Sequence, residues 1–129
     1  MIFKIILIGI GGGAGSILRY LTSVFVEKHF QHIFPIATFA VNFIGCLLMG
    51  LLLGLFEQQQ IVNSNLKFLF VTGFCGGYTT FSAFSAENMN LFQSENSTIA
   101  FVYILLSVFI CIAAVWAGFV TAQFIFKTQ

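Results

Sequence analysis

The sequence predicts an all-α membrane protein with four transmembrane helices and no separate soluble domain. Of its 129 residues, 59% are hydrophobic and only 7% are charged. A soluble domain carries about 25% charged residues, so this chain lacks the polar surface that it would need in water. Its charges fall mainly at the ends of apolar stretches, and each stretch is long enough to cross a hydrocarbon core of about 30 Å.

The expected helices cover residues 2–26, 33–56, 66–92 and 98–126, within a single transmembrane domain over 1–129. The first is nearly as apolar as the others but contains Lys4 near its start and Arg19 further in. The second and fourth stretches are free of charge between their flanking residues. The connections, around residues 27–34, 57–65 and 88–98, are short and polar, which predicts a compact four-helix unit.

The third helix is expected to break near the membrane midplane. Residues 66–75 supply only about 15 Å of helix, half the core thickness. The sequence GGYTT follows at 76–80, and a helix can resume at 81–92. A break at that depth leaves backbone groups that lipid cannot pair, so it must be buried in protein or face water or an ion. The alternative is a continuous helix softened by glycine, and composition alone leaves both open.

Glycines in the first two helices are interpreted as helix-packing positions. The first helix opens on a glycine-rich run, but the third glycine of a dinucleotide-binding fingerprint is missing in every register. Small residues four positions apart let two membrane helices approach closely. Such pairs occur at Gly9/Gly13, Gly11/Gly15 and Gly50/Gly54.

Polar residues inside the apolar stretches fall on helical faces. Helix two carries Thr38, Asn42, Gly45 and Cys46, and helix four carries Tyr103, Ser107, Cys111, Ala114, Gly118 and Thr121. After the break, Phe81, Phe84, Ser85 and Asn88 share a face, with Ser82 beside it. Each of these polar faces, or stripes, is compatible on its own with a role in hydrogen bonding between helices. Their convergence on one broken helix favours a permeation path.

The chemistry of these residues favours an anion as cargo. The glutamates Glu27, Glu57, Glu87 and Glu95 lie at segment ends in this interpretation, which counts against proton-coupled or cation transport. Hydroxyls and amides can donate hydrogen bonds to an anion, and a phenylalanine ring edge is electropositive. Arg19 either draws anions toward a pore mouth or snorkels to the interface near Glu27.

The lysines leave the orientation in the membrane open. With four spans, Lys4, Lys67 and Lys127 fall on one side, against Lys28 and Arg19 on the other. This is a weak positive-inside bias. The chain could insert both ways and form an antiparallel pair, or insert once with the Lys4 end inside.

The remaining composition excludes several partners and activities. A net charge of +1 makes nucleic acid an improbable partner. Cys46, Cys75 and Cys111 lie in apolar segments without metal-ligand spacing and are interpreted as small packing residues. His29 and His32 fall in the first loop, and no cluster of His, Asp, Glu or Cys in the sequence predicts an enzyme.

Three sequence segments resemble the Fluc (also called CrcB) family of fluoride channels. They are GGAG at 12–15 followed by Arg19 and Tyr20, TFAVNFIG at 38–45, and GFCGGYTTFSAFS at 73–85. The resemblance covers the whole chain in order and length, and the third segment is highly specific. It implies a passive fluoride channel that lowers fluoride toxicity, in the plasma membrane (the cell inner membrane) as a multi-pass protein.

The resemblance also implies an antiparallel homodimer of dual topology with two fluoride pores. Phe81 and Phe84 match the family's phenylalanine box, and Asn42 matches a pore asparagine. The surrounding polar pore set is expected to include Thr38, Tyr103, Ser107 and Ser82. Gly76 and Thr79 match positions whose main-chain carbonyls hold a structural sodium ion on the dimer axis, and Arg19 matches a vestibule arginine. The expected partners are therefore fluoride, sodium, the lipid bilayer and a second copy of the chain.

Two other classes of membrane protein remain as alternatives. A small four-helix exporter of cationic drugs shares the length and dual topology, but it should carry a glutamate well inside its first helix, where this chain has Glu27 at the end. A non-transporting assembly factor would use the polar stripes only to pack helices. A fluoride-selective leak from liposomes would distinguish the channel from both.

Overall fold

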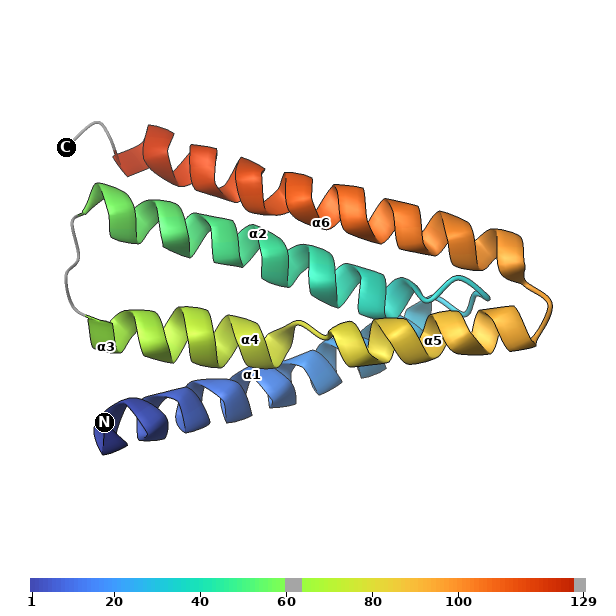
Figure 1. Ribbon diagram of the computed structural model, residues 1–129, viewed down its shortest axis with the longest axis horizontal. Coiled ribbons are helices and arrows are strands. Elements are labelled where there is room, and N and C mark those ends of the chain that lie inside the picture. The colour runs from blue at the N-terminus through green and yellow to red at the C-terminus, as the bar shows by residue number, and fades with distance from the viewer. Residues whose placement is uncertain (60–63, 127–129) are drawn as a thin grey trace.

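The computed structural model describes residues 1–59 and 64–126, and these residues form a helical bundle (Figure 1). Three helices are long and apolar enough to span a membrane: α1 (Ile2–His29), α2 (Ile36–Gln58) and α6 (Ser97–Phe126). A fourth helical column is made of shorter pieces joined end to end. These are α3 (Ser64–Lys67), the π-helix η1 (Phe68–Cys75), α4 (Gly76–Tyr78) and α5 (Phe81–Gln93).

The helix bounds differ from the predicted ones by a few residues. The first helix continues to His29, past the predicted end at residue 26, so His29 belongs to the helix and not to a loop. The second helix starts at Ile36, after Pro35, whose ring fixes φ near the helical value and so suits a helix start. The expected connection over 57–65 falls partly on residues 60–63, which lie outside the described ranges. Lys127, which was expected at one membrane face, also lies outside the described ranges.

The four columns run side by side, and neighbours in sequence alternate in direction (Figure 1). The start of α1, the end of α2, the start of α3 and the end of α6 lie at the same end of the bundle. The opposite end holds the connection from α1 to α2 and the one from α5 to α6. This is the up-and-down arrangement expected for short connections.

Glycines allow two pairs of helices to pack with their backbones in contact. A Cβ atom added at Gly11 or Gly15 of α1 would collide with carbonyl oxygens of η1. The α2–α6 pair behaves in the same way, because a Cβ at Gly50 or Gly118 would collide with backbone of the facing helix. The predicted helix-packing role of Gly9 and Gly13 is wrong within this chain. A Cβ atom added at either position would have nothing within 4 Å, because both positions face away from η1.

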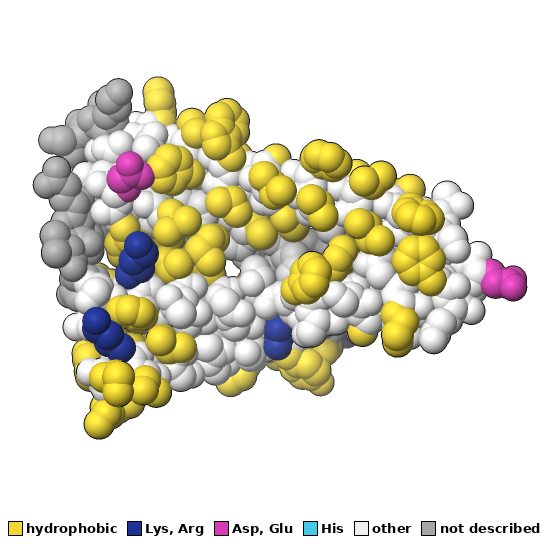
Figure 2. All heavy atoms as spheres, viewed as in Figure 1, with side chains coloured by type: hydrophobic (Ala, Val, Ile, Leu, Met, Phe, Trp, Pro, Cys, Tyr) yellow, Lys and Arg dark blue, Asp and Glu magenta, His cyan; other side chains and the backbone are white. Residues whose placement is uncertain are grey.

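The outer surface is largely apolar. Hydrophobic side chains are spread over the whole length of the face shown in Figure 2, and the charged side chains visible there lie mainly toward the two ends. Large exposed hydrophobic side chains occur along α1 and α6, including Ile10, Leu21, Phe109 and Trp116. Such a surface is stable in lipid and would aggregate in water, which agrees with a multi-pass membrane protein.

Candidate functional site

The interruption of the fourth column is confined to Thr79 and Thr80. Gly76 and Tyr78 are helical, so the break is shorter than the predicted range 76–80 and lies at its end. Thr79 has φ −76° and ψ 155°, and Thr80 has φ −147° and ψ 116°, both extended. The helix resumes at Phe81, where the Thr80 hydroxyl caps α5 by accepting from the Ala83 amide at 3.2 Å.

Asn42 of α2 pairs with the exposed backbone at this break. Its Nδ2 donates to the Thr80 carbonyl at 3.0 Å, and its Oδ1 accepts from the Thr80 amide at 2.8 Å. The side-chain amide of Asn42 therefore pairs with both the backbone N–H and the backbone C=O of Thr80, a residue that is only 9% exposed. Because Nδ2 carries two hydrogens, one donor remains for another acceptor.

Helix α1 supplies donors for two further carbonyls at the break. Ser16 Oγ donates to the Gly77 carbonyl at 3.3 Å, and an Arg19 guanidinium nitrogen donates to the Thr79 carbonyl at 3.3 Å. Carbonyls at the end of a helix lack intrahelical partners. Arg19 therefore turns toward the break, and this contact was not among the two roles considered for it from the sequence.

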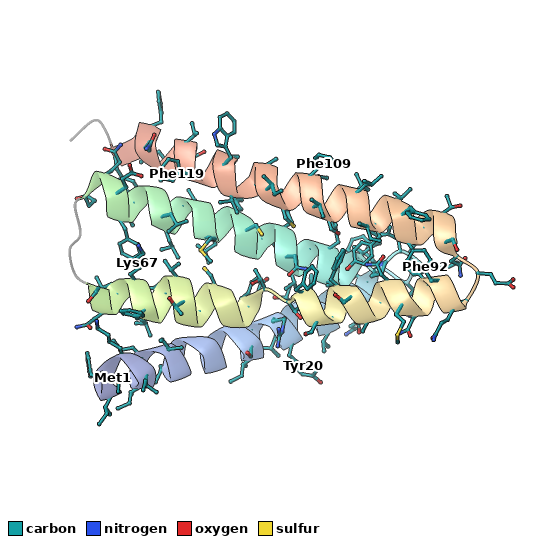
Figure 3. The ribbon with its side chains drawn as sticks, in the orientation of Figure 1. Met1, Tyr20, Lys67, Phe92, Phe109 and Phe119 are labelled. Carbon is teal, nitrogen blue, oxygen red and sulfur yellow. The ribbon has the colours of Figure 1, made fainter. Side chains whose placement is uncertain are left out.

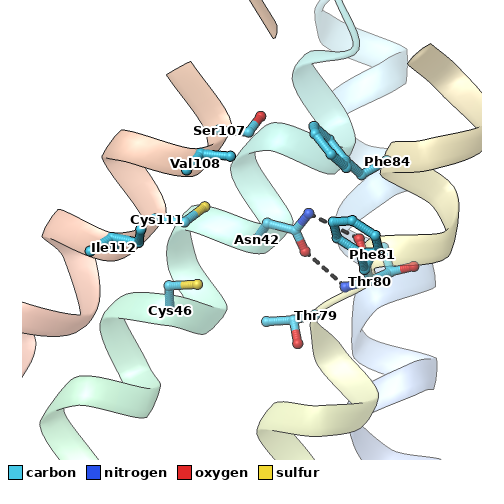
Figure 4. Close-up of a pocket in the computed structure, with 10 residues that line it drawn as sticks. All are labelled: Asn42, Cys46, Thr79, Thr80, Phe81, Phe84, Ser107, Val108, Cys111 and Ile112. Carbon is cyan, nitrogen blue, oxygen red and sulfur yellow. Dashed lines mark hydrogen bonds between the residues drawn. The ribbon is translucent and has the colours of Figure 1, made fainter. Parts of the chain in front are cut away.

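Thr80 lines two pockets. The first, which we name the phenylalanine pocket, has a volume of about 320 Å³ (Figure 4). Its lining residues are Asn42, Cys46, Thr79, Thr80, Phe81, Phe84, Ser107, Val108, Cys111 and Ile112. The second, the arginine pocket, has a volume of about 530 Å³ and is lined by Ser16, Arg19, Tyr20, Ser23, Glu27, Thr38, Val41, Thr80, Ser82, Ala83 and Glu87.

The phenylalanine pocket brings together four of the predicted site residues: Asn42, Phe81, Phe84 and Ser107. The centroids of the Phe81 and Phe84 rings are 5.4 Å apart, with the planes tilted by 41°. Phe84 is buried against Tyr103, at a centroid distance of 5.0 Å, whereas Phe81 is 78% exposed. The Ser107 hydroxyl is buried and has no hydrogen-bond partner among the described residues.

Of the other predicted site residues, Thr79 also lines the phenylalanine pocket and the rest do not. Thr38, Ser82 and Arg19 line the arginine pocket, while Tyr103 is fully buried and lines neither pocket. Of the two predicted sodium-binding positions, Thr79 lines the phenylalanine pocket and Gly76 lines neither.

Glu87 is a site residue that the sequence analysis missed. It had been grouped with carboxylates at segment ends, but it lies in the middle of α5 and lines the arginine pocket. Thr38 Oγ1 donates to Glu87 Oε1 at 2.5 Å, and the Tyr103 hydroxyl donates to Glu87 Oε2 at 2.8 Å. A signal was present, because Glu87 follows Phe84 by three residues and so shares its helical face. Glu87 was assigned to a helix end only because it is charged.

The fold and the pockets together define a class: a small multi-pass helical membrane protein with an interrupted helix bordered by two cavities. Within that class, residues 6–119 match the family described as CrcB-like protein, Camphor Resistance (CrcB), and the chain belongs to this family.

Curated relatives cover nearly the full length of the chain. A protein of Flavobacterium psychrophilum is 54% identical over 116 residues, which is 90% of this chain and 94% of the relative. A protein of Azobacteroides pseudotrichonymphae is 44% identical over 124 residues, 96% of this chain and 99% of the relative. One from Pseudomonas putida is 40% identical over 124 residues, 96% of this chain and 100% of the relative. Each of these relatives is named "Fluoride-specific ion channel FluC".

Proposed function

We propose that this chain is a fluoride-specific channel of the cell membrane, which lets fluoride leave the cell passively and so limits its toxicity. The name shared by near-full-length relatives supports fluoride as the ion. The observation that carries the proposal for this chain is the meeting of Asn42, Phe81, Phe84 and Ser107 around one pocket at the helix break. As a channel, the protein is not an enzyme.

The phenylalanine pocket offers an anion neutral donors in place of water. Asn42 retains one amide hydrogen, and the Ser107 hydroxyl is unpartnered among the described residues. The edges of Phe81 and Phe84 carry the positive part of the ring quadrupole. Conduction requires binding strong enough to dehydrate the ion and weak enough to release it. Neutral groups meet that requirement better than a fixed positive charge inside the pocket would.

The arginine pocket forms the vestibule in this proposal. Arg19 brings a positive charge to a pocket that Glu27 and Glu87 also line, and its guanidinium contacts the Thr79 carbonyl. In this role it attracts anions to the break itself. Thr38 and Ser82 add hydroxyl groups to this polar route. The fully buried Tyr103 contributes indirectly, because it and Thr38 both donate hydrogen bonds to Glu87. Thr80 lines both pockets and so borders the proposed route from one to the other.

We further propose that two chains form an antiparallel homodimer around a structural sodium ion. Sodium is a hard cation that prefers oxygen ligands, and carbonyls at a helix C-terminus carry partial negative charge. In a continuous helix the Gly76 carbonyl would accept from the Thr80 amide, but that amide bonds to Asn42. Gly76 and Thr79 would each contribute a carbonyl, and a two-fold partner would double the set.

An efflux assay tests the proposed function directly. Purified protein is reconstituted in liposomes loaded with fluoride or with chloride, and efflux is followed with ion-selective electrodes. The expected result is rapid fluoride efflux with chloride retained, relative to protein-free liposomes. Equal passage of both anions, or retention of both, would contradict the proposal and would favour an exporter of other cargo or an assembly factor.

A further inference from the structure

Two cysteine side chains line the phenylalanine pocket. Cys46 belongs to α2 and Cys111 to α6, and both are free thiols and half-buried. Helices α2 and α6 pack with their backbones in close contact at Gly50 and Gly118, and the two cysteines of this helix pair face one pocket. Figure 4 shows them on the same side of the pocket, with Thr79 and Thr80 on the opposite side. The proposed ion path does not require either thiol.

The third cysteine differs from this pair in its surroundings. Cys75 is fully buried in η1 and does not line the pocket. The packing role expected from the sequence therefore suits Cys75. Cys46 and Cys111 instead present two polarizable sulfur atoms to a cavity of about 320 Å³.

We propose that Cys46 and Cys111 form a two-thiolate binding site for a soft divalent cation, mercury(II). Thiolates are soft ligands and select soft metals. On binding, the two S–H bonds break, two S–Hg bonds form, and two protons leave to water; no atom changes oxidation state. Two thiolates and one divalent cation make a neutral unit.

Charge and ligand number distinguish mercury(II) from other metals. A monovalent soft cation between two thiolates would leave a net negative charge in a largely apolar pocket, which is costly. Zinc takes four ligands, usually from Cys, His, Asp or Glu. Apart from the two thiols, the lining described for this pocket has no side chain of those types. A two-coordinate cation is therefore the occupant that the pair fits.

The consequence for transport rests on the proposed function. Mercury held between Cys46 and Cys111 occupies the same pocket as Asn42, Phe84 and Ser107. It would block fluoride movement through that pocket, and a strong competing dithiol would restore it by removing the metal.

X-ray absorption at the mercury edge tests the site itself. The full chain carrying Cys75→Ala is loaded with one equivalent of mercuric chloride in detergent micelles, so only the two pocket thiols remain. We expect two sulfur neighbours per mercury and release of two protons. Adding Cys46→Ala or Cys111→Ala should each reduce this to one sulfur neighbour. Cys46→Ser and Cys111→Ser serve as second variants that only replace sulfur by oxygen, a poor ligand for a soft metal, and they should behave like the alanine variants.

One sulfur neighbour in Cys75→Ala, or two neighbours that survive loss of either pocket cysteine, would overturn the proposal. Fluoride efflux is measured separately, on the same variants reconstituted in liposomes with and without mercuric chloride. We expect it to fall at least tenfold on loading Cys75→Ala and to be less affected in the Cys46→Ala/Cys75→Ala variant. Two-sulfur binding with unchanged fluoride efflux would instead contradict the phenylalanine pocket as the fluoride path. Failure of the mercury site and failure of the proposed fluoride path therefore give different results.

Discussion

At the scale of single residues, Asn42 matters first as a structural partner of the backbone. An interrupted helix in a membrane leaves amide and carbonyl groups without partners, and lipid cannot supply them. Asn42 bonds both polar groups of Thr80 with one side chain. The same amide group has one hydrogen left over, at the edge of the phenylalanine pocket. The residue that stabilises the break is thereby also placed to contact an ion.

Asn42→Ala should lower both stability and fluoride efflux. Leaving the buried Thr80 groups unpaired costs about 1–3 kcal/mol per group, and the donor to the ion is lost as well. Thermal unfolding in detergent and liposome efflux measure the two effects. Asn90→Ala is the matched control, because Asn90 is exposed on α5 and its side chain makes no contact with Thr80. A stable, fully active Asn42→Ala variant would contradict this role.

Tyr103→Phe tests the hydrogen bonds to Glu87. The substitution removes the hydroxyl that donates to Oε2 and keeps the ring that packs on Phe84. Because a hydrogen bond to a carboxylate contributes about 1.5–3 kcal/mol, the thermal midpoint should fall by several degrees. Tyr20→Phe, at an exposed ring, should leave it unchanged. Equal midpoints for the two variants would show that the Glu87 contact contributes little.

The sequence allowed prediction of some of these residues and not others. The types and helical spacing of Asn42, Phe81 and Phe84 stand out in apolar segments, and the three residues line one pocket; their roles in conduction stay predictions. The two hydrogen bonds between Asn42 and Thr80, and the one from Arg19 to the Thr79 carbonyl, could not be predicted. They depend on how α1 and α2 cross the break, and spacing along a single helix does not specify that. Glu87 was missed because a charge was assumed to mark a helix end.

At the scale of elements, the close contact between α1 and the η1–α4 segment positions the break. A Cβ at Gly77 would collide with Gly12 backbone, just as one at Gly11 or Gly15 would collide with η1. This close approach brings Ser16 and Arg19 within reach of the carbonyls at Gly77 and Thr79.

Gly11→Ala should separate these two elements. Inserting a methyl group against backbone costs about 1–3 kcal/mol or more, because backbone cannot rotate away as a side chain can. Gly9→Ala is a matched control on the same helix, where a Cβ has nothing within 4 Å. We expect a lower thermal midpoint for Gly11→Ala alone, measured in detergent. A similar loss in both variants would indicate that an intermolecular contact, and not this packing, controls the result, because alanine has the higher helix propensity of the two residues.

The position of the four columns followed from the sequence, but the detail of the third did not. Hydropathy and charge spacing are sufficient to find α1, α2 and α6. Two adjacent glycines suggested a break beginning at residue 76, whereas Gly76 and Gly77 remain helical and the chain extends only at Thr79 and Thr80. Gly77 packs closely against α1, whereas a Cβ at Gly76 would have nothing within 4 Å. The break depends on partners from α1 and α2 that lie far away in sequence.

At the scale of the whole molecule, a single chain leaves the candidate path open on one side. Phe81 borders the break yet is 78% exposed, and the phenylalanine pocket is lined by α2, α5, α6 and the residues of the break, with none from α1. A second copy covering this region would enclose the ion path, which supports the proposed dimer. An antiparallel partner would also double the Gly76 and Thr79 carbonyls around one axis.

Removing sodium should weaken that dimer. Without the cation, the facing carbonyl groups of two broken helices repel each other. Cross-linking or light scattering in detergent, in sodium-containing and sodium-free buffer of equal ionic strength, measures the dimer fraction. We expect a lower dimer fraction and slower fluoride efflux without sodium, restored when sodium is added back. Dimerisation and efflux that are insensitive to sodium would argue against a structural ion.

The central claim is that fluoride passes through the phenylalanine pocket against the ring edges. Fluoride efflux from liposomes containing Phe81→Leu tests it most directly, because a side chain that is 78% exposed contributes little to the fold of one chain. Phe109→Leu is the control, since Phe109 is 68% exposed on α6 and is not part of the pocket lining (Figure 3). We predict at least tenfold slower efflux for Phe81→Leu and a normal rate for Phe109→Leu. A normal rate for Phe81→Leu, in protein that is folded and dimeric, would contradict the account.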